Sequence, residues 1–269
     1  MPAPKLSRAP IPKFTKRELD VANLCAVAIW YGINYETGAI QKISDANLMS
    51  RFAPYFYEYH QTKKKPNPDI FLADVRDLIL ACGIKMLFRG IAGMDFRKGI
   101  NAIYSDVYPI FLKAQKNPTR VSSYKDAVKC LEALSKGFVV NPKDNRLSLA
   151  SRILFFLAPN LQTFNMNNSI AKSYGLQSRP HHHYAGYFEL LAKGLITNQT
   201  ALSKYKIPPM RDELDYKTWY EASRTDWWRR RVLDLAVMFR ASPSIVPNPN
   251  LKHLIQQVRK ADEEKANAV

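Results

Sequence analysis

The sequence predicts a mainly α-helical protein, a compact array of about ten short helices arranged in two lobes. Apolar residues recur along most of the chain at the three- and four-residue spacing of an amphipathic helix. No segment shows the sustained alternation of apolar and polar residues that is typical of a half-buried strand. The 269 residues, of which 46% are hydrophobic, are also enough to bury a sizeable core.

The first predicted helix follows a basic, proline-rich arm of residues 1–15. Thr15 is suited to cap this helix, because Glu18 stands three residues later as its capping-box partner. The apolar residues that follow recur at helical spacing and predict the buried face. They are Leu19, Ala22, Ala26 and Ile29.

Two further helices are expected in the next fifty residues or so. The first spans residues 45–58 and contains Pro54. The second spans residues 69–82, begins after the proline-containing break at 63–68, and ends before Gly83, a typical helix stop. The apolar face of the second helix is predicted from its spacing. It consists of Ile70, Val75, Leu78 and Ile79.

The remaining helices are predicted from the same periodicity. They cover residues 105–113, 123–135, 147–157, 169–174, 184–193, 216–222, 227–239 and 251–267. We divide the chain into the arm 1–15, a helical catalytic and DNA-binding domain 16–242, and a linker with a C-terminal helix, 243–269.

The charge of the chain points to a polyanionic partner. There are 40 lysines and arginines against 23 aspartates and glutamates, a net charge of +17. Such an excess favours nucleic acid, because each neutralised phosphate releases counterions. An anionic membrane surface is the weaker alternative, since no uninterrupted apolar run approaches the length of a membrane span.

The cysteines and the N-terminus indicate a cytoplasmic protein. Cys25, Cys82 and Cys130 are far apart, lie among apolar residues and lack metal-binding spacing, so each is expected to be a buried core thiol. Three isolated thiols fit a reducing compartment. The first residues lack the apolar stretch of a signal peptide.

Several enzyme signatures are absent from the sequence. It contains no P-loop, no G-x-G-x-x-G, no G-x-S-x-G and no H-E-x-x-H. A nucleotidase, a dinucleotide-binding enzyme and a zinc protease are therefore disfavoured, and neither a cofactor nor a metal is expected.

An unusual amide cluster follows the apolar helix 147–157. Asn165, Asn167 and Asn168 stand within four positions, at the start of the next predicted helix. An amide hydrogen-bonds and orients water without carrying charge. Capping explains one of these residues equally well, because asparagine is among the best N-cap residues.

The densest basic and aromatic cluster spans residues 224–231. Arginine pairs with phosphate and aromatic rings stack on bases, so Trp227, Arg229 and Arg230 are candidate DNA contacts. The alternative is architectural. In that case Arg231 pairs with Asp234 one turn later, and Trp228 faces the core with Val232 and Leu235.

A second cluster combines the aromatic residues at 55–59 with His60 and the lysines Lys63, Lys64 and Lys65. The lysines are candidate contacts to the DNA backbone. A core stripe beside solvated lysines is the alternative interpretation.

The three adjacent histidines, His181, His182 and His183, precede Tyr184. Neighbouring histidines on a regular element diverge, which disfavours a metal site. We expect a basic loop in which these four residues contact phosphate or substrate, with a plain surface turn as the alternative.

The segment SLASRILFFLAPNLQTFNMNNSIAKSYG resembles a pattern in the helix-hairpin-helix DNA glycosylase superfamily: a helix rich in small residues, a break at Leu-x-Pro, and a polar residue opening the next helix. The resemblance implies a glycosylase-like fold in which Asn167, or alternatively Asn168, takes the position of the family's catalytic aspartate. Asp144 is a further catalytic candidate, and Lys143 or Arg146 lies near the family's lysine. The family's hairpin would fall at 137–150, which lacks its phosphate-binding G-x-G.

The chain also resembles bacterial antiphage glycosylases that excise modified cytosines from phage DNA. The expected function is a DNA glycosylase-like hydrolase that binds modified duplex DNA as a monomer, flips a base and hydrolyses its N-glycosidic bond. The alternatives are a non-catalytic nucleic-acid-binding protein of replication or of a mobile element, and an RNA-processing enzyme. A deep polar cavity beside Asn167 would favour the enzyme.

Overall fold

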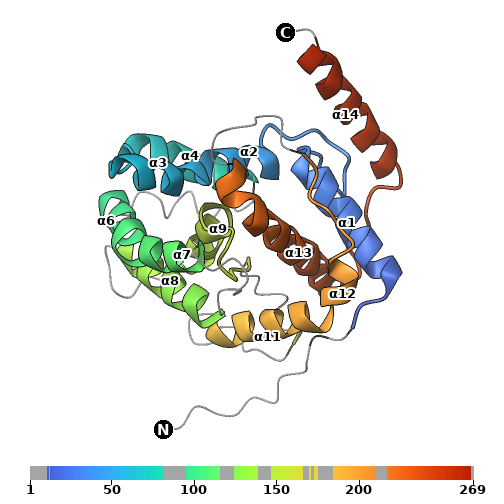
Figure 1. Ribbon diagram of the computed structural model, residues 1–269. Helices are drawn as coiled ribbons and strands as arrows, with labels where there is room; N and C mark the ends of the chain where they lie inside the picture. Colours follow the sequence, from blue (N-terminus) through green and yellow to red (C-terminus); the bar gives the residue numbers. More distant parts are fainter. Residues whose placement is uncertain are drawn as a thin grey trace.

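The computed structural model shown in Figure 1 is mainly helical, as predicted. It describes residues 11, 13–81, 95–115, 124–138, 147–165, 170, 173–174, 184–209 and 217–267, with side chains in the last range from 224 to 264. These residues form no strand, only an isolated antiparallel bridge between Ile33 and Ile40.

The helices follow one another with short connections. They are α1 (Lys16–Trp30), α2 (Asp45–Phe52), α3 (Pro54–Thr62), α4 (Pro68–Ala81), α6 (Phe96–Ala102), the π-helix η2 (Ile103–Val107), α7 (Tyr108–Gln115), α8 (Tyr124–Gly137), α9 (Leu147–Leu157), α11 (Tyr184–Thr197), α12 (Gln199–Leu202), α13 (Lys217–Ala241) and α14 (Leu251–Asn267). The predicted helix 169–174 lies mostly outside the described residues.

The predicted start of α1 is confirmed. The Thr15 hydroxyl accepts a hydrogen bond from the Glu18 amide, and the Glu18 carboxylate accepts one from the Thr15 amide over 2.8 Å. This capping box satisfies backbone donors at the helix start. Leu19, Ala22 and Ala26 are buried as expected, and Ile29 is half-buried.

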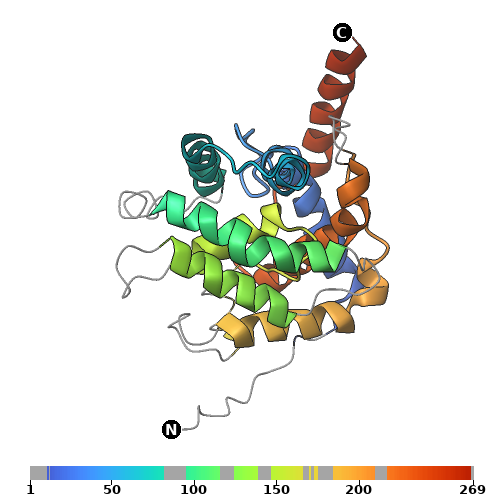
Figure 2. The same ribbon diagram turned by 60° about the vertical axis from the view of Figure 1, so that its left-hand side comes forward.

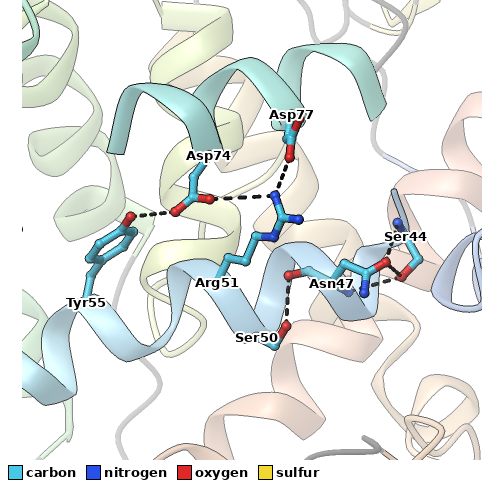
Figure 3. A network of polar contacts seen from close by, with 7 residues as sticks. All are labelled: Ser44, Asn47, Ser50, Arg51, Tyr55, Asp74 and Asp77. Atoms are coloured by element: carbon cyan, nitrogen blue, oxygen red, sulfur yellow. Dashed lines mark hydrogen bonds and ion pairs between the residues drawn. The ribbon is translucent and has the colours of Figure 1, made fainter. Parts of the chain in front are cut away.

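The single helix predicted over residues 45–58 is wrong. Two helices, α2 and α3, meet at Ala53 instead. Pro54 is the first residue of α3, where its missing N–H would have no helical partner in any case. Figure 3 shows how α2 and α3 are held to α4: Arg51 points at Asp74 and Asp77, and the Tyr55 hydroxyl donates to Asp74 over 2.5 Å.

The buried face of α4 was predicted correctly except for Ile70. Val75, Leu78 and Ile79 are buried, but Ile70 is 59% exposed and Phe71 takes its place in the core. Phe71 stands four residues before Val75, whereas Ile70 stands five before it and therefore points to another side of the helix.

Two other predicted segments belong to longer helices. The predicted helix 105–113 is part of a continuous run through α6, η2 and α7. The predicted helices 216–222 and 227–239 are one helix, α13, which crosses the centre of the molecule in Figure 1. The short helix α12 was not predicted.

The ends of the described chain pack on the central helices. Ile11 and Phe14 are buried, and the Phe14 amide donates to Asn198 Oδ1 over 2.8 Å. At the other end, α14 buries Leu251 and Ile255 beside α1, and its last turns project from the body of the molecule in both ribbon views (Figures 1 and 2). Cys25 and Cys130 are buried free thiols, as predicted, whereas Cys82 lies outside the described residues.

Candidate functional site around Asn165 and Asp234

The described end of the amide segment lies against the central helix α13. Helix α9 ends at Leu157, and residues 158–165 continue as a loop without regular structure beyond a turn. One residue of α13, Arg230, holds this loop. Its guanidinium donates to the carbonyl of Thr163 over 2.8 Å, to the Thr163 hydroxyl over 3.1 Å, and to the carbonyl of Pro159 over 2.5 Å.

Asn165 connects the end of this loop to two helices. Its Nδ2 donates to Asp234 Oδ2 over 3.1 Å, and its backbone carbonyl accepts a hydrogen bond from the Tyr187 hydroxyl over 3.0 Å. Asp234 lies one turn after Arg230 on α13, so the same helix carries the loop's anchor and the partner of its terminal amide.

Asp234 is a buried carboxylic acid, with 7% of its surface exposed. Burial raises its pKa to about 6, against the opposing effects of the Arg231 charge and the Asn165 hydrogen bond. Its Oδ1 atom is buried and receives no hydrogen bond from the part of the chain that the structure describes. A buried carboxylate oxygen without a donor is costly, and such groups are often functional.

A second buried carboxylate lies close to Asp234. Asp45, the first residue of α2, pairs with Arg231 of α13 with 2.7 Å between Oδ2 and Nε. Burial raises the pKa of Asp45, and the Arg231 charge lowers it. The charge of Arg152 on α9 also favours ionised Asp234. Asp45, Arg152, Arg231 and Asp234, with Asn165, are called the α13 polar cluster below.

The structure contradicts the predicted DNA contacts of Trp227 and Arg230. Trp227 is fully buried, and its ring lies 5.0 Å from that of Phe155 and 5.9 Å from that of Trp30. Arg230 is 1% exposed, and all of its reach is used by the 158–165 loop. Neither side chain can meet a nucleic acid while the core is intact.

The architectural alternative for residues 224–231 is confirmed in part. Trp228 is buried in the core with Val232 and Leu235. Arg231, however, forms its closest ion pair with Asp45 of α2. Arg229 is half-buried and pairs with Asp226 over 3.2 Å, three residues before it on the same helix.

The second basic cluster also divides between core and solvent. Tyr55 and Phe56 are buried, whereas the three lysines are exposed. The Lys63 ammonium donates to the carbonyl of His60, and the Lys65 ammonium donates to Asn101 Oδ1 on α6 over 2.7 Å. The exposed lysines stay candidate contacts for phosphate.

The other predicted site residues are distributed as follows. Tyr184 is the first residue of α11 and donates a hydrogen bond to Glu132 of α8. The rest lie outside the described residues: Asn167, Asn168, Asp144, Lys143, Arg146, His181, His182 and His183. Asn165 is thus the one described member of the amide segment, and residues 166–169 follow it directly in the chain.

Sequence reasoning missed the carboxylates of the α13 polar cluster. Asp234 appeared there only as a partner for Arg231, and Asp45 only as the start of a helix. A charged residue between apolar neighbours, as in Val232 to Val237, is a usable signal of a buried ionisable group.

Three cavities are lined by described residues, and none of these three includes Asn165 or Asp234. The largest, about 740 Å³, lies between α1 and α14. One of about 510 Å³ lies beside the start of α2 and the middle of α14, and an open groove of about 530 Å³ lies between α6 and α8. Within the described ranges, no group of three or more potential metal ligands is found, and no helix is long and apolar enough to cross a bilayer.

Comparison of this chain with models of protein families, with curated proteins and with solved structures found no match.

Proposed function

We propose that the chain is a DNA glycosylase-like enzyme that flips a modified base out of duplex DNA and hydrolyses its N-glycosidic bond. The observation that carries the proposal is the Asp234 carboxyl, which is buried, has a pKa of about 6 and is hydrogen-bonded by Asn165. This acid lies beside the entrance to residues 166–169, where the sequence resembles the catalytic segment of helix-hairpin-helix glycosylases.

The chemistry of base excision needs a carboxylate more than an amide. Departure of the base leaves positive charge on the sugar, and water must lose a proton as it attacks. A carboxylate offsets that charge and accepts that proton, and a pKa near the working pH suits the second task. In the proposed mechanism Asp234 has this role and Asn165 holds its orientation. The proton acquired by Asp234 returns to solvent after the base has left.

The charge of the chain supports DNA as the substrate-bearing polymer. A net charge of +17 favours phosphate contacts that are strengthened at low salt. Base flipping exchanges stacking within DNA for contacts inside the protein, and backbone contacts help to offset that cost. A role in antiphage defence, with a modified cytosine as the excised base, is the physiological form of this proposal.

A non-catalytic nucleic-acid-binding protein is the second candidate. The near-complete burial of Asp234 favours it, because a catalytic carboxylate must reach its substrate. In that case the α13 polar cluster only joins α2, α9 and α13 to the 158–165 loop.

Base release from defined DNA distinguishes the two candidates. Duplexes that carry cytosine, hydroxymethylcytosine or glucosylated hydroxymethylcytosine are incubated with the protein, and abasic sites are detected by alkaline cleavage. The proposal expects abasic sites in a modified duplex and their loss in Asp234→Asn. Thr163→Val is the matched control, because it removes an acceptor of Arg230 in the same loop but leaves Asp234 and Asn165 in place.

The outcome against the enzyme is equally clear. If the protein binds all three duplexes and releases no base from any of them, the non-catalytic candidate replaces the glycosylase. Release that is unchanged in Asp234→Asn would refute the role of this carboxyl alone.

A further inference from the structure

The groove between α6 and α8 is lined by basic side chains that the sequence did not bring together. Figure 2 shows the two helices side by side, with α6 continuing through η2 into α7. The groove is open, with a volume of about 530 Å³. Lys98 of α6 and Lys129 and Lys136 of α8 line it, and all three are exposed.

The positive charge of these lysines is not neutralised within the groove. Two carboxylates share the lining, Asp106 and Glu132. Asp106 accepts a hydrogen bond from the Ser105 hydroxyl over 2.7 Å, and Glu132 accepts one from the Tyr184 hydroxyl. Among the described residues neither carboxylate forms an ion pair with Lys98, Lys129 or Lys136.

The floor of the groove is made of small residues. Ala102, Ala133 and Gly137 line it, and a side chain on Gly137 would begin 2.7 Å from the Ala102 methyl group. The two helices therefore approach closely, and no large side chain fills the space above them. Lys129 and Lys136 are two turns apart on α8, about 10 Å along the helix.

The basic surface continues beyond the groove. The Lys65 ammonium lies on α6, bonded to Asn101 one turn after Lys98. This contact joins the lysines that follow α3 to those of the groove, so four lysines from three separate segments face the same part of the surface.

We propose that the groove between α6 and α8 binds the phosphate backbone of DNA through Lys98, Lys129 and Lys136, with Lys65 at its edge. The inference rests on the proposed function for the identity of the polyanion. Lysine binds phosphate as a point charge and tolerates variation in position, which suits a contact that grips the backbone without reading sequence. Small floor residues leave room for the backbone to approach.

The test compares two triple variants that remove the same charge. Lys98→Ala, Lys129→Ala and Lys136→Ala are combined in one protein. Lys204→Ala, Lys206→Ala and Lys252→Ala, exposed lysines from other parts of the chain, are combined in the control. Binding to a fluorescent duplex is measured by anisotropy over a salt series, and thermal melting checks that both proteins fold.

For the groove variant we expect at least a tenfold loss of affinity at physiological salt. The slope of log K against log salt should become shallower by about 2 to 3, because each lost phosphate contact removes about 0.9. The control should lose less than half of that slope. An acidic protein segment in the groove would leave DNA binding of the groove variant at the wild-type level.

Three results would overturn the inference. A groove variant with the wild-type slope removes the groove from DNA binding and leaves the proposed function standing. Equal losses in both triple variants show that only the total charge matters. A wild-type protein that does not bind DNA refutes this inference and the proposed function together.

Discussion

Asn165 donates a hydrogen bond to the carboxylate of Asp234 over 3.1 Å, across 69 residues of sequence. The contact ties the end of the 158–165 loop to the central helix α13, whose Arg230 anchors the same loop from one turn earlier. An amide donor next to a buried acid stabilises the charged form, yet burial still holds the pKa of Asp234 at about 6. The acid therefore titrates in the physiological range.

Asp234→Asn should make the protein more stable above pH 6. The folded-state pKa of about 6 lies above the ordinary value of 3.8, so the folded state binds the proton more tightly than the unfolded chain. The stabilisation is complete below pH 3.8 and is lost as the pH rises through 6. At about 1.4 kcal/mol per unit, ionisation costs the wild type about 3 kcal/mol by pH 7.5.

Urea unfolding between pH 4 and 7.5 measures this effect. The difference in free energy of unfolding between Asp234→Asn and the wild type should grow in favour of the variant across this range. Asparagine keeps an oxygen that accepts the Asn165 hydrogen bond, so the contact itself is retained. Parallel pH profiles for the two proteins would contradict the raised pKa.

Arg230→Ala should destabilise the protein by about 3 kcal/mol or more. The change leaves the carbonyls of Pro159 and Thr163 without their donor in a buried site and opens a cavity. Arg229→Ala is the matched control on the next residue. It removes a half-exposed pair with Asp226, for which we expect less than about 1 kcal/mol.

Thermal or chemical unfolding of both variants checks this difference. If Arg230→Ala unfolds like the wild type and instead binds DNA more weakly, its guanidinium serves DNA rather than the loop.

Asn167→Ala should abolish base release while DNA binding persists, as the resemblance to the glycosylase segment implies. If Asn167 serves only as a helix cap, the same change should cost about 1 kcal/mol of stability and leave activity intact. Abasic-site formation and duplex binding, measured on the same preparation, separate the two roles. Full activity in Asn167→Ala would leave Asn168 and Asp144 as the next candidates.

Gly99→Ala should destabilise the packing of α6 on α8 by about 1 to 3 kcal/mol, because added volume in a close-packed core forces its neighbours to shift. A methyl group on Gly99 would lie 2.2 Å from the ring of Phe138, which is itself fully buried. Lys98→Ala, the change at the preceding exposed residue, should leave the melting temperature nearly unchanged. Equal melting temperatures for Gly99→Ala and the wild type would show that Phe138 moves without cost.

Local signals explain the features that were predicted well. The capping box of Thr15 and Glu18, the limits of helix 147–157 and those of helix 251–267 all depend on residues within one or two turns. Where a local signal was ambiguous the prediction was wrong. Pro54 is compatible with the interior of a bent helix or with the start of a new one, and the structure has the second.

The candidate sites required contacts that sequence spacing does not contain. Asp234 meets Asn165 from another part of the chain, and Lys98 shares a groove with Lys129 and Lys136 only because α6 packs on α8. Arg230 and Trp227 had the composition of a DNA contact, and their burial depends on the helices and the loop that surround α13.

The sequence by itself determined a helical protein with a large positive charge, because helical periodicity and composition are properties of neighbouring residues and of the whole chain. Only the tertiary structure decided which charges are available to a partner. Apolar and charged residues alternate around the whole circumference of α13, so the helix has no single solvent face that spacing could identify. Its surroundings cover Arg230 and Asp234, while the lysines of α6 and α8 stay exposed.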